Sequence, residues 1–185
     1  MSRYSYPHTI ENAAGERLTF ERIVAGARGD RLEGDTVVEP GAGPPMHVHF
    51  LQEEGFTVQE GRLGYQQMGR PPQFAGPGES AVFHAGVPHR FWNAGTGKLR
   101  CTAYVEPVDN AEYLLTELFA SQQRNGGARP SLFDAAFLMR RYRTEFALLA
   151  IPAPVQRILF PLLVAIGTVL GKYRRYADAP APVGR

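Results

Sequence analysis

The chain has 185 residues, of which 44% are apolar and 21% charged, and it contains a single cysteine, Cys101. This length supports one domain with an appendage and is too short for two full enzyme domains, while one cysteine excludes a disulfide framework within the chain. The net charge of +2 is unevenly placed, because residues 1–128 sum to −4 and residues 129–185 to +6. The first residues lack the apolar core of a secretory signal, so a cytoplasmic location is expected.

Short apolar runs rich in β-branched and aromatic residues fill residues 17–105 and are separated by glycine and proline. The runs are RLTFERIV, DTVVEP, MHVHF, GFTVQEG, RLGYQQM, SAVFHAG, HRFWNAG and LRCTAYVEP. Their even spacing, with no helical pattern between them, predicts an antiparallel sandwich or barrel. We therefore expect a mainly β domain over residues 1–107.

Beyond Pro107 the pattern becomes helical. Asp109, with Glu112 three residues later, forms a capping-box pattern and predicts a helix over about residues 110–124. After the break NGGARP, Ser131 repeats the capping signal ahead of a second helix that covers LFDAAFLMRRYRTEFALL. Residues 108–185 are therefore predicted to be a helical C-terminal extension.

The last apolar segment is harder to place. Residues 158–171 form an uncharged stretch of 14 residues, which is short of the roughly 20 that span a bilayer. Pro161 is expected to kink any helix there, and residues 177–185 resemble a frayed tail. Because residues 131–176 combine apolar faces with arginines, they could pack on the barrel, pair with a second subunit or lie on a lipid surface.

Two histidines and two glutamates lie close together in the stretch MHVHFLQEEG. Alternate residues of a strand point to the same face, so His47 and His49 project together and can share one cation. Glu53 or Glu54 could supply a third ligand, and His89, from another strand, a fourth. Three neutral imidazoles and a carboxylate suit one divalent transition metal, Fe, Mn, Ni, Cu or Zn.

The spacing of these residues resembles the two sequence motifs of the cupin superfamily. The first motif, Gly, five residues, His-x-His, three or four residues, Glu, six residues and Gly, is matched by Gly41, His47, His49, Glu54 and Gly61. The second motif is matched by Gly78, Gly86, His89 and Asn93, with His84 at its proline position. The resemblance covers about residues 30–107 and implies a double-stranded β-helix, or jelly-roll barrel, ahead of the α-helical extension.

The resemblance also implies a ligand set. The six-residue spacing to Gly61 is met by Glu54 and not by Glu53, so the family's metal ligands correspond to His47, His49, Glu54 and His89. One or two coordination positions then stay open for water or substrate, as catalytic metal sites require. Strand parity places Glu53 on the opposite face.

Strand parity further predicts a pocket lined mostly by apolar and aromatic side chains. Phe56 and Val58 share parity with Glu54, and Phe91 shares it with His89. Phe50, Tyr65 and Tyr104 are expected to add to the same lining. His84 is expected either at the rim, near a turn, or else directly behind the metal ligands or facing the substrate. No arginine cluster or phosphate cradle accompanies these residues, so the pattern favours an uncharged or aromatic substrate over a sugar phosphate.

Two kinds of enzyme fit such a site. A redox-active metal would support oxygenase chemistry on a small oxygenated molecule, with Glu54 as a base, whereas zinc would support isomerase, lyase or hydrolase chemistry. By family analogy the oxygenase-like enzyme is the first expectation. The alternative is a non-catalytic small-molecule-binding module that docks to a membrane surface or to a partner through its basic helices.

Partners follow from the same features. A small-molecule ligand is expected in the barrel, and the cupin resemblance implies a homodimer. No helix-turn-helix pattern precedes the barrel, so nucleic acid is not an expected partner. A peripheral membrane contact would involve residues 146–176.

Overall fold

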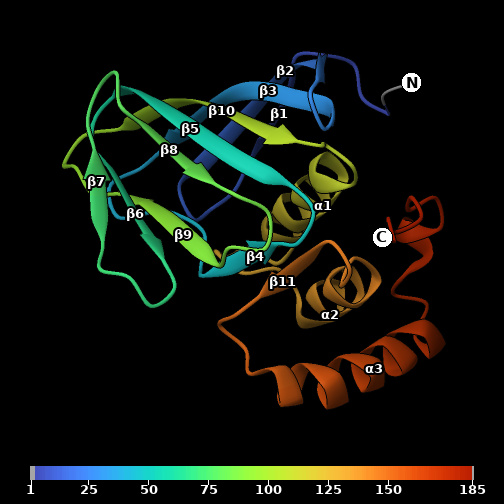
Figure 1. Ribbon diagram of the computed structural model, residues 1–185. Coiled ribbons are helices and arrows are strands. Elements are labelled where there is room, and N and C mark those ends of the chain that lie inside the picture. The colour runs from blue at the N-terminus through green and yellow to red at the C-terminus, as the bar shows by residue number, and fades with distance from the viewer. Residues whose placement is uncertain (1–2, 185) are drawn as a thin grey trace.

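The computed structural model describes residues 3–184, and its strands form two antiparallel sheets that face each other (Figure 1). The first sheet has the order β1-β2-β3-β10-β5-β8, with bounds His8–Glu11, Glu16–Gly26, Gly29–Val38, Leu99–Glu106, Glu53–Glu60 and Ser80–Phe83. The second sheet has the order β11-β4-β9-β6-β7, with bounds Phe146–Leu148, His47–His49, His89–Asn93, Leu63–Gln67 and Gln73–Ala75. This arrangement confirms the predicted jelly-roll barrel with a helical extension.

The space between the sheets holds an apolar core to which both sheets contribute. Its buried members include Val38, Val58, Leu63, Phe83, Leu99 and Cys101. Alternation along the strands explains this: in β5, Phe56 and Val58 point inward while Thr57 is less buried. The core therefore fixes which face of each strand looks into the barrel.

The motif residues Gly61 and Asn93 have structural roles. Gly61 has a φ of +88°, and a side chain there would collide with the Lys98 carbonyl, so only glycine suits this turn. Asn93 is buried, and its amide donates to the carbonyls of Val38 and Gly97, each at 2.8 Å. These contacts hold the strand ends together without reaching the histidines.

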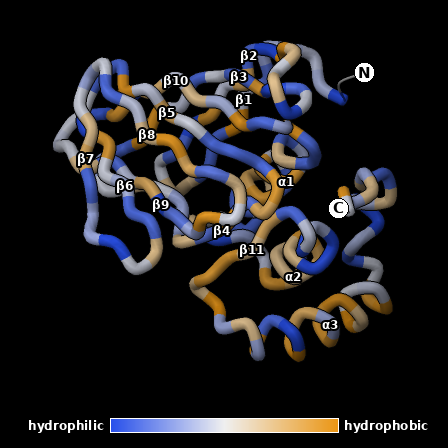
Figure 2. The backbone as a smooth tube through the Cα atoms, viewed as in Figure 1, coloured by the Kyte–Doolittle hydropathy of each residue, from blue (hydrophilic) through white to orange (hydrophobic). Residues whose placement is uncertain are grey.

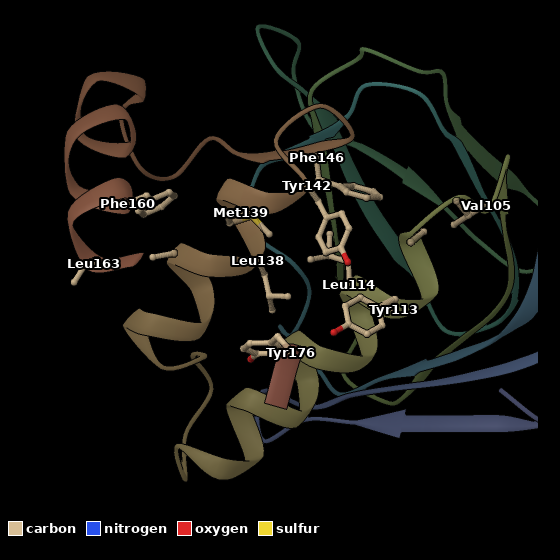
Figure 3. Packing of buried hydrophobic residues seen from close by; sticks show 12 residues of the cluster. Val105, Tyr113, Leu114, Leu138, Met139, Tyr142, Phe146, Phe160, Leu163 and Tyr176 are labelled. Atoms are coloured by element: carbon tan, nitrogen blue, oxygen red, sulfur yellow. The ribbon is translucent and has the colours of Figure 1, made fainter. Parts of the chain in front are cut away.

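Three helices follow the barrel and form a second core with one of its edges. They are α1 (Ala111–Arg124), α2 (Leu132–Arg141) and α3 (Ala153–Val169), and a short 3-10 turn covers Arg174–Tyr176. Figure 3 shows Phe160 of α3 pointing toward α2, while Tyr142 and Leu138 face α1; Leu163 belongs to the same cluster. Val105 at the end of β10 belongs to the same cluster, so the second core is continuous with the barrel.

The second helix is shorter than the sequence pattern predicted. Ser131 caps it as expected, accepting a hydrogen bond from the Asp134 amide at 3.1 Å. It ends at Arg141, and Phe146–Leu148 then forms strand β11, which pairs with β4. The extension thus contributes a strand to the barrel.

Two smaller expectations were also wrong. Asp109 does not cap α1, because it has a left-handed φ of +39° and the cap position is Asn110. The segment 177–184 is docked: Arg141 donates to the Ala179 carbonyl at 2.7 Å, and the Val183 amide donates to the buried Glu145 at 2.9 Å. The end of the described chain is therefore part of the helical layer.

Candidate metal centre

Three strands bring four potential ligands together at one end of the barrel. His47 and His49 come from β4, and His89 lies directly opposite His47 on β9. Glu54 reaches the same place from β5 in the other sheet. One ligand atom from each residue lies within 4.8 Å of all the others, so the group could hold a metal ion.

Backbone carbonyls orient two of the imidazoles. His47 Nδ1 donates to the Pro45 carbonyl and His89 Nδ1 to the Val87 carbonyl, each at 2.8 Å. With the proton on Nδ1, the Nε2 atom of each neutral ring carries a free lone pair. This is the arrangement by which proteins prepare histidine for a metal.

The contact between His89 and Glu54 tests whether a cation fits here. His89 Nε2 lies 3.1 Å from Glu54 Oε2, and Glu54 is only 9% exposed. A lone pair that faces a buried carboxylate oxygen needs a proton or a cation between them. His49 Nδ1 is also buried, with no hydrogen-bond partner among residues 3–184. A divalent cation would satisfy all of these atoms, so the residues fit a metal.

The protonation states agree with this reading. Burial lowers the pKa of His47, and it lowers the pKa of His49 to about 3. Burial raises the pKa of Glu54, but the contact with His89 and the nearby imidazoles lower this pKa by a larger amount. The pKa of Glu54 is therefore lowered overall, to about 2. At neutral pH the site therefore offers the neutral imidazoles of His47 and His49 and the ionised carboxylate of Glu54, the forms that bind a metal.

Aromatic rings enclose the cluster. The Phe83 ring stacks on His89 at a centroid distance of 4.0 Å, and Phe146 meets His49 edge-on at 4.9 Å. Neither ring was predicted to lie at the site. The pairing of Phe83 with Glu54 depends on a strand register that sequence does not reveal, and Phe146 lies on a strand of three residues, too short to show a period.

The residues predicted to line the pocket divide into two groups. Phe56, Val58 and Phe91 are buried in the barrel core, and Tyr65 packs against that core. Phe50 and Tyr104 are corrections. Phe50 is 43% exposed. Tyr104 pairs with Gly55, faces away from the ligands, and donates to Glu53 at 2.8 Å. Its neighbour Val105 pairs with Glu54 instead, so the inward parity of β10 falls on odd-numbered residues.

His84 lies at the surface, as its rim alternative expected. Its side chain is 73% exposed and contacts Glu53 at 2.6 Å, so the other alternative, a place behind the ligands, is wrong. Glu53 also pairs with Arg28 at 2.9 Å. The two adjacent glutamates are therefore used on opposite faces of β5, Glu54 among the histidines and Glu53 in an ion-pair network.

The comparisons with known proteins agree with this architecture. The model of the cupin domain family matches residues 34–105, a span that contains both motifs and all four clustered residues. With the two-sheet barrel already described, this match identifies residues 34–105 as a cupin domain.

Individual relatives are more distant. Oxidoreductase iacF of Pestalotiopsis fici is 35% identical over 77 residues, which cover 40% of this chain and 37% of that protein. Epoxidase atD of Aspergillus terreus is 29% identical over 120 residues, 64% of this chain and 33% of that protein. The chain thus spans about a third of the length of these curated relatives. A solved double-stranded β-helix protein from Klebsiella pneumoniae is 21% identical, with a TM-score of 0.41, covering 57% of this chain and 78% of that one.

No helix among residues 3–184 is long and apolar enough to cross a membrane.

Proposed function

We propose that the protein is a metal-dependent enzyme of the oxygenase type that acts on a small, apolar or aromatic molecule bearing oxygen functions. The observation that carries this proposal is the group of three imidazoles and one carboxylate inside an apolar barrel. A redox-active divalent metal held there would supply the activation of O2 and of an enolic or phenolic oxygen, whereas zinc would supply only the latter.

The surrounding side chains favour an uncharged substrate. Phe56, Phe83 and Phe91 are each no more than 5% exposed; the Phe83 ring stacks on His89, and the Phe56 ring contacts those of Phe83 and Phe91. Such rings exclude water and bind apolar groups. Among residues 3–184, the buried charged side chains include no lysine or arginine that would neutralise a phosphate. Glu54, ionised and buried, is the group available to accept a proton from an enol or phenol.

The names of two relatives support the same class. One is called an oxidoreductase and the other an epoxidase. Both names belong to proteins that this chain matches only in part, so the specific reaction is proposed from the site.

The test combines metal analysis with oxygen uptake. The purified protein is expected to contain Fe, Mn, Ni or Cu and to consume O2 with at least one member of a panel of enols, phenols and diketones. Glu54→Gln should abolish uptake, whereas the matched change Glu53→Gln on the outer face should retain it. A zinc protein that isomerises or cleaves a panel member without O2 would contradict the oxygenase proposal. Binding of a panel member without turnover would instead support the non-catalytic alternative.

A further inference from the structure

The outward face of α3 is apolar along its whole length. Six exposed side chains, three or four residues apart for the most part, form this face: Val155, Ile158, Leu162, Ile166, Val169 and Leu170. Ile158 is 74% exposed and Val169 88%. Figure 2 shows the helix at the edge of the molecule, on the side away from the barrel, with hydrophobic colours along much of its length and hydrophilic colours near its start. A continuous apolar stripe of this kind on a soluble surface marks a contact site.

The position of α3 is fixed by its other face. Phe160, Leu163 and Gly167 are buried, and Phe160 and Leu163 belong to the second core (Figure 3). A side chain at Gly167 would overlap the Tyr173 ring, which shows how closely the following turn packs on the helix. Turning the apolar stripe inward would therefore dismantle this core.

No described part of the chain is free to cover the stripe. The closing segment 177–184 is held elsewhere: Arg141 donates to Ala179 and Pro180, Asn110 to Ala181, and Thr144 to Val183. A cover for α3 must therefore come from outside residues 3–184.

The charges around the stripe indicate what that cover is. The exposed cations Arg157, Lys172 and Arg174 lie on α3 or just after it. The three acids of residues 129–184 do not pair with them, because Glu145 is buried, Asp134 lies 3.8 Å from Arg175, and Asp178 pairs with Arg3 at 2.7 Å. A twofold contact between two copies would place these like charges against each other. An anionic lipid surface complements both the charge and the apolar stripe.

We propose that α3 is a membrane-surface helix that lies flat on an anionic bilayer. The stripe from Val155 to Leu170 enters the boundary between headgroups and acyl chains, while Arg157, Lys172 and Arg174 contact the headgroups. This proposal does not depend on the metal centre or on catalysis.

Co-sedimentation of the full chain with vesicles tests it. The protein is expected to bind vesicles of equimolar phosphatidylcholine and phosphatidylglycerol, more weakly at high salt, and to bind pure phosphatidylcholine less. Ile158→Glu and Val169→Glu should each lower the partition coefficient about 10-fold or more, because a charge then enters the apolar boundary. Both side chains are largely exposed, so the thermal unfolding midpoint should stay unchanged.

Matched controls separate the surface from general effects. Met68→Glu alters a side chain 53% exposed on the barrel, and Arg70→Glu makes the same charge change as Arg157→Glu at a site outside the extension. Both controls should bind vesicles like the unaltered chain, whereas Arg157→Glu should bind less. Equal loss in controls and α3 variants, or no vesicle binding at all, would overturn the proposal. So would a dimer that Val169→Glu converts to monomers without changing vesicle binding, since the stripe would then be an interface between two copies.

Discussion

The adjacent residues Glu53 and Glu54 of β5 point to opposite faces of the strand. Replacing each in turn therefore tests whether Glu54 is the metal ligand. Glu54→Gln removes the carboxylate of the four-residue cluster. We expect metal affinity to fall more than about 100-fold, because removing even a residue that only hydrogen-bonds to a metal ligand lowers affinity about 10- to 100-fold. Glu53→Gln should change metal affinity less than about 10-fold, since its contacts are Arg28, His84 and Tyr104. Competition with a chromogenic chelator measures both constants. Equal losses would show that the ligand is misassigned.

A second carboxylate should give the fold a measurable pH dependence. Glu106 is 1% exposed and accepts the Arg28 amide at 2.8 Å and the Arg31 guanidinium at 2.6 Å. The hydrogen bond from the Arg28 amide, then that from Arg31, hold the pKa of Glu106 below its ordinary 4.5. A carboxyl with a depressed pKa stabilises the fold above its unfolded pKa and loses this effect as pH falls through the folded value.

Glu106→Gln should therefore reduce the free energy of unfolding near neutral pH, and the difference from the unaltered chain should shrink as pH falls below 4.5. Urea denaturation at a series of pH values measures this. Glu60→Gln is the control, because Glu60 and Arg100 form an exposed pair at 3.2 Å, which should contribute little. A Glu106→Gln difference that is constant down to about pH 3 would contradict the linkage.

Several residue positions could be predicted from the sequence, and the reason is geometric. The period of two along a strand places His47 and His49 on one face, and the motif spacing adds Glu54 and His89. Parity could not be assigned to Tyr104, because its strand β10 has no motif residue to show which face looks inward. The structure places the odd-numbered Leu99 and Cys101 in the core, so Tyr104 lies on the outer face.

At the scale of elements, strand β11 links the extension to the metal centre. Phe146 pairs with His49 in the sheet and its ring touches the imidazole. Truncating a buried phenylalanine costs about 3–5 kcal/mol, and here it should also loosen a ligand, which lowers metal affinity about 10-fold. We expect Phe146→Ala to show both losses in urea denaturation and in chelator competition.

Phe160→Ala provides the matched control. Phe160 is 4% exposed and Phe146 6%, and both belong to the second core, but no contact joins Phe160 to a ligand among the described ring pairs. Phe160→Ala should cost a similar free energy of unfolding, about 3–5 kcal/mol, with metal affinity retained. If both variants lose metal equally, the effect of Phe146 is one of global stability alone.

Helix ends and short strands set the limit of prediction at this scale. The periodic stretch before Arg141 predicted α2 and its Ser131 cap, since a repeated pattern and a specific cap reinforce each other. The pattern did not predict the end of α2 or the presence of β11. An apolar run such as FALL fits a helix or a strand equally well, and only the open edge of β4 decides between them.

For the whole molecule, one hydrophobic core joins the barrel to the helical layer, so we expect the two parts to fold together. Val105 of the barrel packs in the same cluster as Tyr113, Leu138 and Tyr142. A chain truncated after Gln123 would lose β11 and expose this cluster, at about 1.5–3 kcal/mol for each large side chain. We expect the truncated chain to aggregate or to lack a cooperative unfolding transition, as measured by solubility and near-UV circular dichroism. A soluble, folded truncated form that keeps its metal would show that the extension is separable.

We infer that the cluster of His47, His49, Glu54 and His89 binds one metal ion per chain. Elemental analysis of the purified chain beside the double variant His47→Ala, His49→Ala, with folding of both checked by circular dichroism, tests this claim. We predict about one transition-metal ion per chain in the unaltered protein and none above background in the folded double variant. Stoichiometric metal in the double variant, or an unaltered protein that stays metal-free after incubation with each candidate ion, would contradict the claim.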